Sequence, residues 1–435
     1  MSDMETGKWS DLPNELLEMI LTKLSSINIQ NFQAVCPPWR NAAKSYTSSS
    51  SYTNLHHVPW LLLPKTDQDN YDFRFFSLQD DKVIRRISRP RDLNIPQKFY
   101  NSLCLGSSYG WLVMLDEMAT PYLFDPFYLT QIQLPDIDTI ELFKFSKSDD
   151  DGLDIIPYSG STESLMHFKS VHDLRGYFFS NAVVSSNFYE NRGEIYVLMI
   201  ASFGDAGSQL MFFRSGGYDV WMLLGDYDQT YSDIVCYDDR FYALNAFADK
   251  VELWDTTIYT PELDEEFVVP MPPVLAETRS FLENCTSSRT YLVKSCEDDL
   301  LLVQRYIGDF VDGDPGEDIY RTLVFEVYKL DFSINEWVQV ESLGDQVLFL
   351  GGVQSISLSI QDVPACQPNS IYFTDDCWAR LHEHNVRYDV GVFHMEDKSI
   401  EAFHQCDLGS EPPPIWVDPK VMLESWAWNA KHYVS

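Results

Sequence analysis

Beyond residue 54 the chain consists of short apolar runs separated by turn-forming residues. The runs are rich in Val, Ile, Phe, Tyr and Trp, and Gly, Asp, Asn, Pro and Ser separate them, which is typical of antiparallel strands joined by tight turns. Helical periodicity nearly vanishes over the same region. The pattern predicts hairpins that pair residues 110–115 with 122–124, 193–200 with 209–213, 241–245 with 251–254, 289–293 with 300–306, 323–330 with 337–340 and 347–350 with 371–374, and a strand at 390–395.

The hairpins recur in groups that close on similar short segments. These segments are Asp-Pro-Phe at 125–127, Leu-Trp-Asp at 253–255 and Asn-Glu-Trp at 335–337. A repeat of variable period indicates the blades of a propeller, and a pair of sandwiches is the alternative. The propeller is favoured because radial closure limits exposed strand edges. We therefore predict a mainly β fold with a propeller of six blades, with five or seven blades as open alternatives.

The first fifty residues have a different pattern, with apolar side chains at helical spacing. Pro13 suits the first helical position, and five apolar residues follow at steps of one, three and four residues: Leu16, Leu17, Ile20, Leu21 and Leu24. A second short helix is predicted at residues 28–35, and a third from Trp39 onward, after two prolines. Three helices in some forty residues are near the lower limit for an independent core, so burial against a partner is expected.

This segment resembles an F-box over residues 9–46. The resemblance rests on Leu-Pro-x-Glu-Leu-Leu-x-x-Ile-Leu-x-x-Leu from residue 12 and on Val-Cys-x-x-Trp-Arg from residue 35. Two departures are Pro37-Pro38, where the family usually has a basic or small polar residue, and residues 25–28, where it often has Pro or Asp. The resemblance implies a three-helix module that binds the Skp-type adaptor of a cullin–RING ubiquitin ligase. Matched by position, the adaptor-binding residues are Leu12, Pro13, Leu16, Ile20, Leu24, Val35, Cys36 and Trp39.

A second resemblance covers the C-terminal half of the chain. It rests on Tyr328-Lys-Leu-Asp with Trp337 and Gly351, and on the segments 369–376, 389–396 and 412–417. These segments are similar to a plant family that joins an F-box to a KIB-type domain related to kelch propellers. The domain organisation that follows is an F-box at 1–46, a polar linker at 47–54, a kelch-like, KIB-type β-propeller at 55–408 and a C-terminal tail at 409–435 that packs on the propeller.

Composition limits the classes of partner. The chain has 66 acidic and 31 basic residues and a net charge of −35, so it repels phosphate backbones and anionic membrane surfaces. No nucleic-acid or membrane partner is therefore expected. The polar N-terminus lacks an apolar signal segment, and the eight cysteines show no CxxC pair. These features favour reduced thiols and a cytoplasmic and/or nuclear location.

Candidate catalytic and metal-binding residues are weakly supported. The mixed cluster of residues 375, 376, 377, 382 and 384 matches no zinc spacing, and the acidic segment 309–318 lacks EF-hand spacing. We therefore predict no catalytic residue, no metal and no cofactor. Six tryptophans are expected in blade cores, with a binding face as the alternative: Trp111, Trp221, Trp254, Trp337, Trp378 and Trp416.

Together, the resemblances imply the substrate-recognition subunit of a Skp–cullin–F-box ubiquitin ligase. The F-box would dock the adaptor, and the propeller would present loops to a target protein whose binding residues the sequence does not identify. Such a chain would perform no chemistry itself. Two alternatives remain open: a ligase-independent protein-interaction scaffold, and a propeller hydrolase with a carboxylate or histidine cluster in its channel.

Overall fold

The computed structural model describes most of the chain, in segments. The described residues are 9–22, 24, 29, 32–47, 59–63, 72–78, 82–87, 102–108, 111–125, 130–140, 143–147, 153–157, 166–168, 174, 178–185, 195–203, 207–225, 229–238, 240–247, 249–256, 261–273, 285–311, 318–353, 355–376, 389–402 and 414–417.

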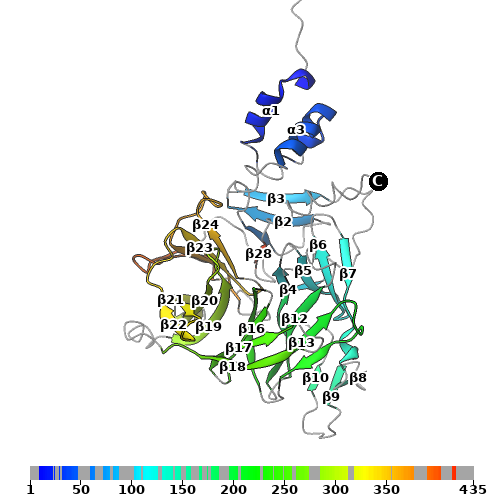
Figure 1. Ribbon diagram of the computed structural model, residues 1–435, viewed down its shortest axis with the longest axis vertical. Helices are drawn as coiled ribbons and strands as arrows, with labels where there is room; N and C mark the ends of the chain where they lie inside the picture. The colour runs from blue at the N-terminus through cyan, green and yellow to red at the C-terminus, as the bar shows by residue number, and fades with distance from the viewer. Residues whose placement is uncertain are drawn as a thin grey trace, which may run out of the picture.

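Two α-helices are described at the N-terminus, outside the β-sheets (Figure 1). A short 3₁₀ helix, η1 (Trp9–Asp11), precedes α1 (Asn14–Leu21), and α3 (Pro37–Thr47) follows. Pro13 is the N-cap of α1 rather than its first residue, and α3 begins at Pro37, two residues before Trp39. Both prolines of α3 thus lie in its first turn, where a missing N–H costs nothing. Residues 28, 30 and 31 of the second predicted helix, 28–35, lie outside the described residues, so three helices are not established.

The described strands form six sheets of four or five strands and one sheet of three. The six larger sheets follow one another around a centre as blades 1 to 6 (Figure 1). The first three blades are blade 1 with β28 (Ile415–Val417), β1 (Trp60–Leu63), β2 (Asp72–Ser77) and β3 (Lys82–Ile87); blade 2 with β4 (Leu103–Ser108), β5 (Trp111–Leu115), β6 (Pro121–Asp125) and β7 (Thr130–Gln133); and blade 3 with β11 (Phe179–Val184), β12 (Tyr196–Ser202), β13 (Ser208–Arg214) and β14 (Met222–Leu224).

The other three blades complete the ring. They are blade 4 with β15 (Tyr231–Tyr237), β16 (Arg240–Asn245), β17 (Lys250–Asp255) and β18 (Glu262–Pro270); blade 5 with β19 (Cys285–Lys294), β20 (Leu300–Val311), β21 (Asp318–Asp331) and β22 (Glu336–Gln339); and blade 6 with β24 (Ile356–Ser359), β23 (Gln346–Leu350), β25 (Ser370–Phe373), β26 (Gly391–His394) and β27 (Ile400–Ala402). Between blades 2 and 3 lie η3 (Ile137–Thr139) and the three-stranded sheet of β8 (Phe143–Lys147), β9 (Leu153–Pro157) and β10 (Met166–Phe168).

Turn chemistry explains where the strands reverse. Asp238, Asp298 and Asn335 have positive φ angles of 49°, 61° and 53°, and each lies in the tight turn between two antiparallel strands of a blade. Asp and Asn tolerate this left-handed conformation better than other residues with a side chain. The three segments that close the predicted repeats lie near the junction of the third and fourth strands of a blade. The third strands β6 and β17 end at Asp125 and Asp255, and segment 335–337 lies at the start of the fourth strand β22.

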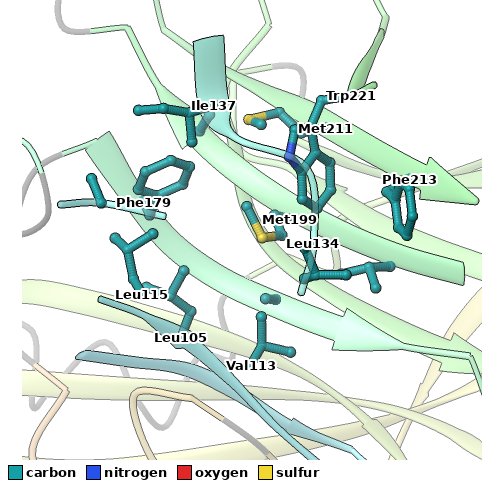
Figure 2. Close-up of a cluster of buried hydrophobic side chains, with 14 of the residues drawn as sticks. Leu105, Val113, Leu115, Leu134, Ile137, Phe179, Met199, Met211, Phe213 and Trp221 are labelled. Atoms are coloured by element: carbon teal, nitrogen blue, oxygen red, sulfur yellow. The ribbon is translucent and has the colours of Figure 1, made fainter. Parts of the chain in front are cut away.

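Six buried apolar clusters join consecutive blades and close the ring. Figure 2 shows the cluster between blades 2 and 3, in which Leu105 and Val113 of blade 2 face Met199 and Met211 of blade 3, with Trp221 packed beside them. Corresponding clusters join blades 3 and 4, 4 and 5, 5 and 6, 6 and 1, and 1 and 2. The predicted mainly β fold with six blades is therefore confirmed.

Blade 6 departs from the predicted hairpin pattern. Residues 347–350 and 371–374 were expected to form a hairpin, but β23 and β25 pair in parallel. The chain first turns back through β24, which pairs antiparallel with β23 and packs against β19 of blade 5. This extra strand lies at the centre of the ring. The chain reverses again after β24, so β25 runs in the same direction as β23 and pairs with its other edge in parallel.

The last described strand belongs to the first blade. β28 pairs antiparallel with β1, with Trp60 opposite Val417 and Leu62 opposite Ile415. The Trp416 indole N–H donates to the Leu350 carbonyl of blade 6 at 3.1 Å, and its ring meets Phe349 edge-on at 5.1 Å. Residues 415–417 thus supply the central strand of blade 1, between blades 6 and 2. The rest of the predicted tail, 409–413 and 418–435, lies outside the described residues.

Candidate functional site

Helices α1 and α3 pack through one small apolar core. Leu17 and Leu21, one turn apart on α1, are fully buried, and they contact a cluster that includes Phe32, Ala43 and Tyr46. Residues four apart lie on the same helical face, which is why these two leucines point inward together. The predicted stripe on α1 therefore divides: Leu17 and Leu21 form the core, while Leu16 faces solvent.

Apolar side chains of this region are also exposed to solvent. Leu16 and Met19, three residues apart and so neighbours on α1, expose 45% and 65% of their surface, and Val35, in the turn before α3, exposes 57%. Ile20 and Trp39 are partly buried at the edge of the core. Exposed apolar residues that gather on one face of a small module are typical of an interaction site.

None of the eight residues predicted to bind the adaptor is fully buried. Pro13, Leu16 and Val35 are exposed, and the other five, Leu12, Ile20, Leu24, Cys36 and Trp39, are half-buried. All eight thus expose part of their surface to solvent, and their role in adaptor binding stays a prediction.

Trp39 and Trp9 fix the edge of this surface. The Trp39 ring stacks on Phe32 with centroids 4.4 Å apart, and its indole N–H donates to the Trp9 carbonyl at 3.0 Å. The Arg40 Nε–H donates to the Gln33 carbonyl at 3.2 Å, which ties α3 to the residues before it. Sequence reasoning missed Trp9, 74% exposed, and Met19, because neither belongs to the inward-facing helical stripe. An aromatic residue in an otherwise polar N-terminal stretch was the available signal for Trp9.

The centre of the propeller holds a second concave site. A cavity of about 520 Å³ is lined by the central strands of blades 2 to 6, β4, β11, β15, β19 and β24. Asp233 lies in its wall and holds three blades together. Its carboxylate accepts hydrogen bonds from Asn181 Nδ2 of blade 3 at 2.5 Å and from the Leu292 N–H of blade 5 at 2.6 Å. Burial raises the pKa of Asp233 to about 7, against the opposing effect of these donors and of the Ile234 N–H.

The channel groups are engaged with one another rather than arranged as a reacting pair. Ser295 and Ser357 both donate to Gln346 Oε1, at 2.8 and 3.1 Å. Burial raises the pKa of the Cys296 thiol, so it is a poor nucleophile at neutral pH. The described lining contains carboxylates but no histidine, which gives the hydrolase alternative no base–nucleophile arrangement to rest on.

The described part of the predicted mixed cluster is structural. Asp376 accepts a hydrogen bond from the Tyr291 hydroxyl at 2.5 Å and faces the fully buried guanidinium of Arg305, and Asp375 accepts from the Asp389 N–H at 3.0 Å. Residues 377, 382 and 384 lie outside the described residues, as do 312–317 of the acidic segment. Within the described ranges, no group of three or more His, Cys, Asp and Glu side chains is placed to hold a metal ion.

The tryptophans lie mainly in blade cores, as predicted. Four of the six are buried, Trp337 is half-buried and Trp378 lies outside the described residues; the buried four are Trp111, Trp221, Trp254 and Trp416. Across the part of the chain that the structure covers, no helix has the length and apolar character needed to cross a membrane.

Comparison with known proteins matches both parts of the chain. A KIB1-4 beta-propeller family model matches residues 75–394, and an F-box domain model matches residues 9–48. F-box protein SKIP23 of Arabidopsis thaliana is 28% identical over 442 residues, covering 96% of this chain and 97% of that protein. F-box protein At2g26160 of the same plant is 24% identical over 391 residues, covering 86% of this chain and 97% of that protein.

Proposed function

Because the chain belongs to the KIB1-4 β-propeller family and carries an F-box domain, we propose that it is the substrate-recognition subunit of a Skp–cullin–F-box ubiquitin ligase. The exposed apolar face of α1 and α3 would dock the Skp-type adaptor and, through it, the cullin–RING ligase. The propeller would bind a target protein.

The observation that carries this proposal is the division of α1 into an inner and an outer apolar face. Leu17 and Leu21 already supply the core, so Leu16 and Met19 add nothing to the fold of the module. Their exposure costs solvation free energy that burial against a partner recovers, at roughly 25 cal/mol per Å² of apolar surface. The complex with an adaptor that covers this face would be stabilised in proportion to the apolar area buried.

In this mechanism the chain acts by proximity alone. Holding a target lysine near the charged ubiquitin-conjugating enzyme raises its effective concentration, and the reacting groups belong to the other subunits. The chain would thus be a non-catalytic receptor without a cofactor. The free thiols of Cys104, Cys285 and Cys366 support the proposed cytoplasmic and/or nuclear location, where thiols stay reduced.

The test is adaptor capture by the full chain with Leu16→Ala and Ile20→Ala combined. Each truncation at a well-packed interface position costs about 1–2 kcal/mol, so capture should weaken by roughly two orders of magnitude. Met118→Ala, which truncates an exposed apolar residue of the propeller, is the control and should leave capture unchanged. Unaltered capture by the double variant would refute the ligase role and favour the ligase-independent scaffold.

A further inference from the structure

An exposed aromatic cluster lies where blades 4 and 5 meet. The ring of Tyr237, in the turn between β15 and β16, stacks on Phe332, in the turn between β21 and β22, with centroids 5.8 Å apart and planes 11° from parallel. Phe332 also lies 6.3 Å from the ring of Phe267 and is 43% exposed. Ile334, in the same turn as Phe332, exposes 58%. We call Tyr237, Phe332 and Ile334 the aromatic face.

The aromatic face lies at the end of the propeller where the central channel opens. Strands alternate in direction within a blade, so the turns between its first and second and between its third and fourth strands share one end. Tyr237 and Phe332 belong to such turns, and so does Asp298, which also lines the channel. The Tyr237 hydroxyl donates to the Asp298 carbonyl at 2.6 Å, and Lys294 Nζ lies 5.7 Å from the Tyr237 ring.

Carboxylates dominate the surface around this face. The two lysines there already have acidic partners, since Lys294 pairs with Asp298 at 3.5 Å and Lys329 with Asp299 at 3.2 Å. Further carboxylates lie on the same turns and on β18 and β22; Asp264 and Asp331 are partly exposed, and the others are exposed: Asp238, Glu262, Glu265, Glu266, Glu297 and Glu336. The local excess of negative charge follows the sign of the whole chain.

We propose that the aromatic face binds a segment of the target protein in which Lys or Arg alternates with large apolar residues. This inference rests on the proposed function, because it identifies where and what the receptor would bind. Apolar side chains of the segment would cover Phe332 and Ile334, which water now contacts. Its cations would meet the surrounding carboxylates. An acidic segment of the same apolar content would be repelled.

The test uses the full chain and labelled peptides, with binding followed by fluorescence anisotropy. One peptide alternates Lys and Arg with Leu and Phe, a second replaces every basic residue with Glu, and a third replaces every apolar residue with Ser. We expect the first to bind at least roughly tenfold more tightly than the others. Phe332→Ser with Ile334→Ser should reduce its affinity by roughly tenfold or more at any salt concentration.

A second variant separates charge from apolar contact. Asp238→Asn with Glu297→Gln should weaken binding several-fold near about 0.05 M salt and only slightly near about 0.5 M, because added salt screens exposed charges. Phe247→Ser and Glu117→Gln are the controls. Both residues are exposed in turns between second and third strands, at the opposite end of the propeller. These two variants should bind the peptide as the wild type does.

Three results would overturn the inference: equal binding of the basic and acidic peptides, binding that Phe332→Ser with Ile334→Ser leaves unchanged, or equal losses in the controls. The same variants are assayed for adaptor capture. Normal capture with unaltered peptide binding refutes the aromatic face alone. Failure of the wild-type chain to capture the adaptor refutes the proposed ligase role, whatever the peptides show.

Discussion

Arg305 provides the sharpest test of how blades 5 and 6 are held together. Its side chain is fully buried, and its guanidinium donates to Thr322 Oγ1 at 2.8 Å, to the Thr374 carbonyl at 3.0 Å and to Asp389 Oδ2 at 2.9 Å. Asp376 Oδ1 lies 3.4 Å from Nη1, and the Phe373 ring lies 4.9 Å from the guanidinium carbon. Replacement by Met keeps an unbranched chain of similar volume and removes every one of these bonds.

The expected loss of stability comes from the buried carboxylates that Arg305→Met leaves without their cation. Removing one partner of a buried ion pair costs about 3–5 kcal/mol, because the remaining charge stays buried without compensation. Here two carboxylates remain, but Asp376 keeps the Tyr291 hydroxyl and Asp389 keeps the Thr322 N–H and hydroxyl, so the cost should not double. With an unfolding entropy of about 2.1 cal/mol/K per residue, a propeller of about 350 residues should lose about 4–7 °C in Tm.

The assay is thermal unfolding followed by circular dichroism. The matched control is Lys329→Met, which breaks the pair of Lys329 with Asp299, where Lys329 is 48% exposed. An exposed pair contributes at most about 1 kcal/mol, so this Tm should fall by less than about 1.5 °C. If Arg305→Met lowered the Tm no more than Lys329→Met does, the buried network would not stabilise the contact between blades 5 and 6.

Three further predictions concern the ring. Gly106→Ala places a Cβ 1.8 Å from the Ala182 carbonyl oxygen, so the central strands of blades 2 and 3 must separate, and the urea midpoint should fall by the equivalent of about 1–3 kcal/mol or more. Burial raises the pKa of Asp233 to about 7, so the folded state binds the proton more tightly than the unfolded chain does. The stability of the wild type should therefore fall as pH rises from about 4 to about 7, and Asp233→Asn should lack this part of the pH dependence; identical pH profiles would contradict the reasoning. Trp416→Ala removes a buried ring and its bond to Leu350, and should cost about 3–5 kcal/mol in urea unfolding; a loss below 1 kcal/mol would show that β28 is dispensable.

Most of the propeller could be predicted because its hairpins are local. An apolar run, a turn residue that tolerates positive φ and a second apolar run specify an antiparallel pair without reference to the rest of the chain. Blade 6 was beyond this reasoning, because the runs at 347–350 and 371–374 have the same period in parallel and antiparallel pairs. The intervening strand β24, Ile-Ser-Leu-Ser, is half polar, and all four of its residues border the channel.

The sites were less predictable than the blades. Apolar spacing on α1 predicted a stripe that includes Leu16, Leu17 and Leu21, but only packing against α3 decides which of them faces inward. Arg305 had one signal, a lone charge within an apolar run of β20, and its partners lie from 14 residues before it to 84 residues after it in the chain. The aromatic face is assembled from turns of two blades, so its residues share no sequence motif.

The pairing of β28 with β1 also sets the order in which the chain can mature during synthesis. The N-terminal helices end at Thr47, whereas the ring cannot close until Val417 has been made. At about 5–20 residues per second, the intervening 370 or so residues take roughly 20–70 s to translate. During that interval helices α1 and α3 are complete while blade 1 still lacks its central strand. If these helices dock the adaptor as proposed, a nascent chain could engage it before the propeller is able to hold a target.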